Sequence, residues 1–193
     1  MNESRTCCVL GHKTITETEE LNARLYNIIE KLILSENVDT FLFGSKSAFN
    51  DFCLDLVTKI KEKYPHIKRI YVRAEFPYIS EDYKNYLLKS YEDTYYPEKI
   101  IDASRAVYIK RNYEMINNSR FCIVYYDEQN APTNRKSGTK IALDYAIKSG
   151  KHVIQLPIST DKFFNHNANA GTNIGVPPHT PVAFEKSDGK PIK

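Results

Sequence analysis

Short apolar runs alternate with longer amphipathic stretches over the first 156 residues of the chain. Residues 6–10, 40–43 and 68–72 have the length and apolar character of strands, and each run ends in a turn of small or polar residues. Residues 121–126 form a continuous apolar run, which is typical of a strand buried on both faces. A fifth run covers residues 151–156. The pattern therefore predicts a sheet of about five or more strands.

Between these runs, apolar side chains recur at the spacing of one helix face. The stretches with this spacing are residues 16–34, 49–63, 106–119 and the segment after Ser137, and residues 80–91 show it within an irregular insert, residues 76–104. Thr16 and Glu19 have the spacing of a capping box. Strands that alternate with helices predict an α/β, Rossmann-like three-layer fold with a mainly parallel sheet.

The length of 193 residues fits one domain with an accessory segment. We expect the Rossmann-like domain to span residues 1–156. From residue 157 onward the sequence mixes asparagine, glycine and proline without periodicity. We expect residues 157–193 to be an irregular C-terminal appendage.

Charge, cysteine spacing and hydropathy bear on nucleic-acid binding, metal binding and cellular location. The chain has 27 Lys and Arg against 24 Asp and Glu, a net charge of +3, and no dense basic block, which argues against nucleic acid as partner. We expect Cys7, Cys8, Cys53 and Cys122 to be unpaired thiols without zinc, because their spacing suits no tetrahedral site. The sequence shows neither a signal peptide nor an apolar run of membrane length, so we expect a cytoplasmic protein.

Three turns are candidates for binding a phosphate. The strongest is Ser137-Gly138-Thr139, which precedes a predicted helix, because the first amides of a helix have no internal partner. An ordinary N-cap at Ser137 explains the same residues equally well. Gly44-Ser45 and Gly11-His12 follow two other predicted strands. For His12, an exposed turn histidine is the alternative interpretation.

Several segments together resemble the SLOG superfamily, and in particular its YspA/YoqJ-like branch. The segments are TCCVLGHK, FLFGSKSAFNDFC, KRIYVRAEFPY, RNYEMINNSRFCIVYYD and KSGTKIALDYAIKSGKHVI, and the resemblance covers roughly residues 5–156. It implies a Rossmann-like fold that binds nucleotides or nucleotide-derived ligands. It also implies a homodimer, since relatives in this superfamily commonly form dimers.

The phosphoribohydrolase branch of that superfamily carries R-K-x-x-M and, after a strand, P-G-G-x-G-T-x-x-E. Arg111 resembles the arginine of the first motif, which implies a catalytic or phosphate-facing role. Gly138 and Thr139 resemble the G-T of the second, which implies phosphate binding. Ala142 stands where those hydrolases have their glutamate. A carboxylate stabilises the positive charge that develops when a ribosyl bond breaks, and the remaining candidates to supply one are Asp127 and Glu75.

The leading functional hypothesis is binding of a nucleotide or nucleotide-derived small molecule, by a sensor or a sequestering protein, at the carboxyl edge of the sheet. No cofactor is expected. An alternative is a nucleoside-monophosphate N-glycosidase that uses Asp127 or Glu75. A third is single-stranded DNA binding, as in the DNA-processing relatives, which the small net charge disfavours.

Overall fold

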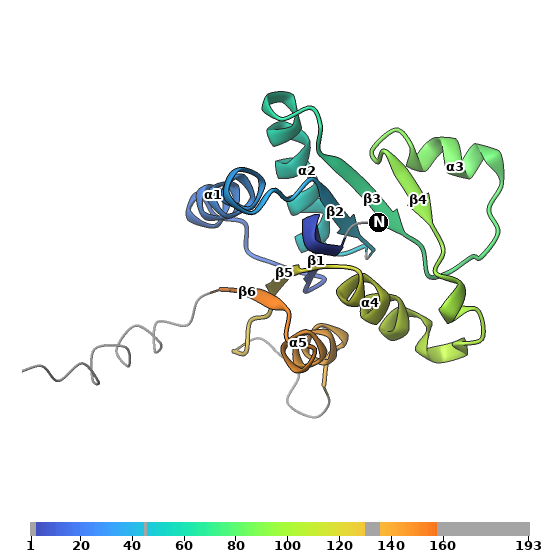
Figure 1. Cartoon of the computed structure of the whole chain (residues 1–193). Helices are drawn as coiled ribbons and strands as arrows, with labels where there is room; N and C mark the ends of the chain where they lie inside the picture. The colour runs from blue at the N-terminus through green and yellow to red at the C-terminus, as the bar shows by residue number, and fades with distance from the viewer. Residues whose placement is uncertain (1–2, 45, 130–135, 158–193) are drawn as a thin grey trace, which may run out of the picture. The chain divides into compact units, whose positions relative to one another are not determined.

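The computed structural model describes residues 3–44, 46–129 and 136–157, and these residues contain one six-stranded, all-parallel sheet (Figure 1). The strands are β1 (Thr6–Gly11), β2 (Thr40–Phe43), β3 (Lys68–Val72), β4 (Asp93–Tyr95), β5 (Phe121–Tyr125) and β6 (His152–Leu156). Their order across the sheet is β4-β3-β2-β1-β5-β6. From β1 to β4 each strand is added on one side of the previous strand, and β5 and β6 are then added on the other side of β1. The boundary between β1 and β5 is therefore the point at which the strand order reverses.

Helices cover both faces of this sheet, which confirms the predicted α/β Rossmann-like three-layer fold. The helices are α1 (Glu19–Glu36), α2 (Ala48–Lys63), α3 (Glu81–Leu87), α4 (Val107–Asn117) and α5 (Gly138–Lys148), with 3-10 turns at Glu3–Arg5, Glu98–Ile100 and Ser104–Ala106. α1 and α2 lie together on one face and α4 and α5 on the other (Figure 1). Among the described helices, none has the length and apolar character to cross a membrane.

The central strands are apolar throughout because both of their faces are buried. In β1, Cys7 and Val9 join the core beneath α1 and α2, whereas Cys8 and Leu10 join the core beneath α4 and α5. Successive residues of a strand point to opposite faces, so a strand covered on both sides needs an apolar side chain at nearly every position. Full burial of an aliphatic side chain such as Val9 or Leu10 contributes about 1.5–3 kcal/mol.

The four cysteines are buried free thiols in the described part of the chain. Cys8 and Cys122 are register partners on β1 and β5, and their sulfur atoms lie 3.4 Å apart. Burial raises the pKa of the Cys7 and Cys8 thiols well above the usual value, so both are protonated at neutral pH.

The start of α1 corrects the predicted capping box. The N-cap is Thr18, whose side-chain oxygen accepts a hydrogen bond from the Leu21 amide at 3.1 Å, and the helix begins at Glu19. Thr16 and Glu19 do have the spacing of a box, but the residues between them lie outside the helix, and Thr18 is extended. A threonine two residues later satisfies one of the free amides of the first turn.

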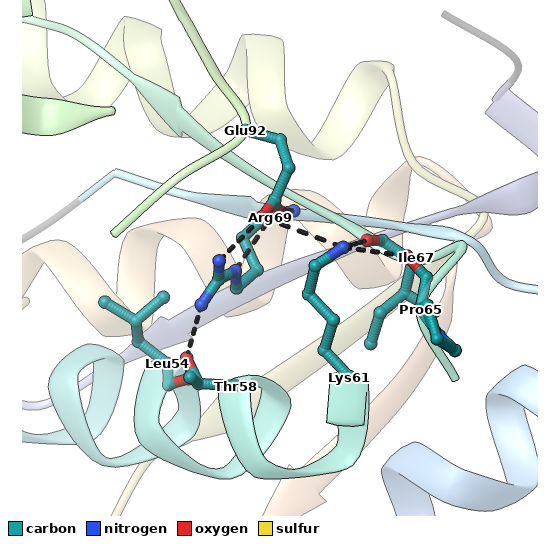
Figure 2. A network of polar contacts seen from close by, with 7 residues as sticks. All are labelled: Leu54, Thr58, Lys61, Pro65, Ile67, Arg69 and Glu92. Carbon is teal, nitrogen blue, oxygen red and sulfur yellow. Dashed lines mark hydrogen bonds and ion pairs between the residues drawn. The ribbon is translucent and has the colours of Figure 1, made fainter. Parts of the chain in front are cut away.

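The insert predicted to be irregular contains a strand, β4, which pairs with β3 at the edge of the sheet. Figure 2 shows the polar contacts that attach this segment to the body of the domain. Arg69 of β3 donates to Glu92 through Nη2 at 2.6 Å and through its backbone amide at 2.6 Å, and its Nη1 donates to Thr58 of α2. Burial alone would raise the pKa of Glu92, but the hydrogen bonds from Arg69 lower it, so the carboxylate stays charged. Within the same insert, the helical spacing of residues 80–91 yields only the short helix α3.

Two expectations fall outside the described residues. Apart from Pro157, the predicted C-terminal appendage lies beyond the part of the chain that the structure describes, and so does Ser45.

Candidate functional site

The carboxyl ends of β1 and β5 meet at the point where the chain reverses direction across the sheet. Gly11, the last residue of β1, is in register with Tyr125, the last residue of β5. After β1 the chain goes to α1 on one face, and after β5 it goes to α5 on the other (Figure 1). In open α/β sheets, the crevice outside such a switch point is where ligands bind. The fold thus brings Gly11, His12 and Asp127 to this edge.

Gly11 is required by packing at this edge. A β-carbon on Gly11 would lie 2.3 Å from Cδ1 of Phe49, which is fully buried in the first turn of α2. The Phe49 ring also packs against Tyr125, with ring centroids 5.2 Å apart. The glycine therefore lets α2 begin directly above the end of β1.

His12 is held between two aromatic rings rather than exposed in a turn. Its ring centroid lies 6.1 Å from that of Tyr125 and 5.3 Å from that of Tyr126. The Nε2 atom is buried and has no hydrogen-bond partner among the described residues. Burial lowers the pKa of His12, and the negative charge of Asp127 opposes that shift only in part. His12 is consequently a neutral imidazole at pH 7, with an unused polar atom beside the switch point.

A cavity of about 310 Å³ opens at the carboxyl ends of β5 and β6, next to the start of α1. Its polar wall consists of Thr16, Thr18, Glu20, Arg24, Tyr125 and Asp127. Its apolar wall includes Leu21 and Leu156. The volume falls at the lower end of the range that small-molecule sites occupy, roughly 300–1,000 Å³.

Of the cavity residues, only Asp127 was a candidate from the sequence. Its Oδ1 accepts a hydrogen bond from the Gln129 amide at 3.0 Å, which orients the carboxylate just past β5. Apart from Tyr125 of β5, the rest of the polar wall comes from the segment that leads into α1 and from the first two turns of that helix. One signal in the sequence indicated the residues before and within α1: they follow β1, and parallel sheets bind ligands at the carboxyl ends of their strands.

The Ser137-Gly138-Thr139 turn begins α5, as predicted. Ser137 is the N-cap, and its hydroxyl accepts from the Lys140 amide at 3.1 Å. A β-carbon on Gly138 would have no described atom within 4 Å, so the space beside this backbone is open. Among the described residues that line the cavity, none belongs to α5.

Two lysines lie near the start of α5 and share one carboxylate. Lys136 and Lys140 contact Asp144 at 3.0 Å and 2.9 Å, and the hydrogen bonds from these lysines lower the pKa of Asp144. Exposed pairs of this kind contribute little to stability, and a ligand can compete for the lysines. Ala142, by contrast, is 1% exposed and packs into the core beneath α4 and α5. A glutamate at that position would be buried.

Gly44 and Arg111 meet at a different place, the carboxyl end of β2. Arg111 is 2% exposed and donates to the Val72 carbonyl at 3.1 Å and to Oδ1 of Asn112 at 3.0 Å. A β-carbon on Gly44 would lie 2.6 Å from Nη1 of Arg111. Burial lowers the pKa of Arg111 to about 10, so the guanidinium is still charged at neutral pH.

Glu75 belongs to this second group and lies apart from the cavity walls. Its Oε1 accepts a hydrogen bond from the Tyr108 hydroxyl at 3.0 Å, and its charge favours the protonated form of Arg111. The structure therefore divides the predicted site residues into two groups. Gly11, His12 and Asp127 lie at the β1–β5 end. The Ser137-Gly138-Thr139 turn follows β5 in the chain. Gly44, Arg111 and Glu75 lie at the β2–β3 end.

Neither protein-family models nor curated proteins give a match to this chain. The site is therefore described by its own residues and by the Rossmann-like fold that positions them.

Proposed function

We propose that this protein binds a nucleotide or nucleotide-derived small molecule at the β1–β5 end of the sheet, as a sensor or a sequestering protein. The observation that carries the proposal is the cavity of about 310 Å³ at the carboxyl end of β5, beside the switch point of a parallel sheet. The resemblance to the SLOG superfamily supports the same ligand class, and membership of that superfamily is part of the proposal.

The phosphate of such a ligand would bind at the start of α5. The open space beside Gly138 allows an anion to approach the backbone, and the N-terminal end of a helix favours negative charge. The Thr139 hydroxyl would donate a hydrogen bond to the phosphate. The Lys140 ammonium would bind the phosphate after breaking its ion pair with Asp144. Ser137 would act mainly by shaping the turn, because its hydroxyl already caps the helix.

The proposal is for binding without turnover. The position that carries the hydrolase glutamate is occupied by Ala142, whose methyl group is buried and can neither stabilise an oxocarbenium ion nor accept a proton. The alternative is an N-glycosidase. The observation that favours it is the carboxylate of Asp127 in the cavity wall, which would take the role of the missing glutamate. Wild-type protein incubated for hours with nucleoside monophosphates and analysed by chromatography separates the two. Multiple-turnover release of free base that Asp127→Asn abolishes would establish the glycosidase.

The test of the proposal has two steps. A mass-spectrometric survey of small molecules carried by the purified protein should find a nucleotide or a derivative, and calorimetry with nucleoside monophosphates should then give saturable binding. Gly138→Val should weaken that binding roughly tenfold or more by closing the approach of the phosphate. Its stability should be unchanged, because the new side chain meets no described atom.

Ser149→Val provides the matched control, since Ser149 is exposed at the opposite end of α5. It should bind as the wild type does. If no nucleotide is carried and none binds, the proposal fails. If Gly138→Val binds normally, the phosphate does not lie at the start of α5.

A further inference from the structure

β6 is an edge strand of the sheet, and it lacks the features that usually protect such an edge (Figure 1). Proteins protect edge strands by keeping them short or by placing charged residues, prolines or bulges in them. The other edge strand, β4, has three residues and begins with the exposed acid Asp93. β6 has five residues, with the sequence HVIQL, and contains no lysine, arginine, acid or proline. Its outer edge is therefore suited to pairing with a further strand.

The pairing of β6 with β5 determines which backbone groups of β6 point outward. The His152 amide donates to the carbonyl of Arg120, just before β5, at 3.0 Å, so His152 bonds toward β5. Backbone groups of successive strand residues point in opposite directions within the sheet, so those of Val153 and Gln155 point away from β5. Among the described residues, β6 has β5 as its only neighbouring strand, and these outward groups have no ladder partner.

The side chains of β6 are covered less completely than those of the inner strands. Every residue of β5 is buried, whereas Val153, Ile154 and Gln155 are half-buried. Ile154 packs against the core beneath α1 and α2, and Val153 packs against the core beneath α4 and α5. In α5, which packs against β6, Ile147 is 58% exposed. A subunit added at this edge would bury apolar surface that the single chain leaves in contact with water.

An antiparallel pair of two β6 strands is self-complementary when Ile154 lies opposite Ile154 of the partner subunit. In that register Val153 faces Gln155 of the partner subunit, and the two residues exchange both of their backbone hydrogen bonds. The same exchange occurs on the other side of the twofold axis, so every outward backbone group of Val153 and Gln155 finds a partner. No charged residue stands opposite a like charge, because β6 contains no lysine, arginine or acid.

We propose that two copies of this chain pair through β6, antiparallel and centred on Ile154, so that two six-stranded sheets become one continuous sheet. A second copy is the partner because the strand's own sequence satisfies each outward group in one register, and no charge on β6 calls for an oppositely charged partner. The pairing places His152 of the partner subunit opposite Leu156, which lines the cavity, so the interface borders the candidate site. The proposal concerns assembly and does not depend on the proposed function.

The first experiment measures the mass of the full chain in solution by sedimentation equilibrium. The wild type should form a dimer in a concentration-dependent manner. Gln155→Pro removes one outward amide from each copy, and with it half of the hydrogen bonds across the pair, so the dimer dissociation constant should rise roughly tenfold or more. Proline is tolerated at an edge position whose amide faces outward, so pairing with β5 should persist. Gln155→Val, the matched control, keeps the amide and should dimerise as the wild type does.

Cross-linking tests the register directly. Across a non-hydrogen-bonded antiparallel pair the Cα atoms are about 4.5 Å apart, which is within the range of a disulfide. Ile154→Cys should therefore form a covalent dimer when the oxidant diamide is added. Ser149→Cys, an exposed control at the end of α5, should run as a monomer on a denaturing gel. The wild type should do the same, because its four cysteines are buried.

A wild type that stays monomeric at every concentration tested would overturn the proposal, and this includes the case in which residues 158–193 of the same chain occupy the edge. A dimer that Gln155→Pro leaves unchanged would lie on another surface and would also overturn it. If that variant does not fold, the absence of a cross-link in Ile154→Cys decides the same point.

Discussion

At the β2–β3 end of the sheet Arg111 and Glu75 are hydrogen-bonded to other groups of the protein, whereas at the β1–β5 end Asp127 lines a cavity. Arg111 donates to the Val72 carbonyl and to Asn112, and Glu75 accepts from Tyr108. At the other end, Asp127 lines a cavity of about 310 Å³ and Nε2 of His12 is buried without a partner among the described residues. Both ends lie at the carboxyl edge, which is where parallel sheets bind ligands.

The difference shows that position at the carboxyl edge does not by itself make a residue a ligand contact. A buried polar group costs free energy unless it is hydrogen-bonded, so a group satisfied within the protein contributes to the fold. A group that lines a cavity can also contact a ligand there. We therefore propose that the β2–β3 end acts mainly in stability and that the β1–β5 end is the binding end.

The largest expected effect compares two glycines of the candidate site. Gly11→Ala should lower the free energy of unfolding by about 3 kcal/mol, because its β-carbon would overlap the buried Phe49 ring. Gly138→Ala should change it by less than about 0.5 kcal/mol, since its β-carbon meets no described atom. Chemical denaturation measures both. Equal stability of the two variants would contradict the packing role of Gly11.

Arg111→Ala tests whether the β2–β3 end is structural. It should cost about 2–3 kcal/mol of stability, because it leaves the Val72 carbonyl without its donor and empties a buried volume. Nucleotide affinity of the folded variant should change by less than about threefold. Lys110→Ala, which removes the neighbouring exposed cation, should alter neither quantity. A large loss of affinity with unchanged stability would show instead that Arg111 contacts the ligand.

A third comparison sets Glu75 against Asp127. Glu75→Gln should leave the affinity for ribonucleoside monophosphates within about twofold of wild type, whereas Asp127→Asn should lower it roughly tenfold. The reason is that Glu75 pairs with Tyr108, outside the cavity wall, while Asp127 is part of that wall. Calorimetry on both variants decides the point, and the reverse order of effects would move the site to the β2–β3 end.

The smallest expected effect is on the pH dependence of stability. The pKa of His12 is lowered in the folded protein by burial, so the unfolded chain binds a proton more readily. Stability contributed by neutral His12 is present at pH 7 and is lost as the pH falls through about 6.5, the ordinary value for histidine. In His12→Gln this part of the pH dependence should disappear, while the exposed His66→Gln should retain it. Denaturation curves between pH 5 and pH 7.5 would show the difference, and an unaltered slope in His12→Gln would count against burial as the cause.

Local patterns predicted most of the fold correctly. The unbroken apolar run at residues 121–126 indicated a strand buried on both faces, and β5 is the fifth strand in the order across the sheet, between β1 and β6. Ser137 indicated a helix start because an N-cap acts on amides only two or three residues away, and α5 begins there. The alternation of strands and helices required parallel crossovers, because each helix has to return over the sheet.

Contacts between distant residues decided what those patterns left open. β4 is only three residues long, and Arg69 of β3 contacts Glu92, the residue just before β4. Local periodicity does not show this pairing. The spacing around Arg111 could not show that its side chain is buried beside Gly44.

Apart from β4, the sequence by itself determined the order of strands and helices along the chain, the buried faces and the helix that starts at Ser137, because periodicity and capping act over a few residues. Only the tertiary structure decided that Gly11 makes room for Phe49, that Arg111 is enclosed, and that Asp127 shares a cavity with the start of α1. Those features depend on close packing between segments far apart in the chain, where a shift of one side chain fills or opens the space.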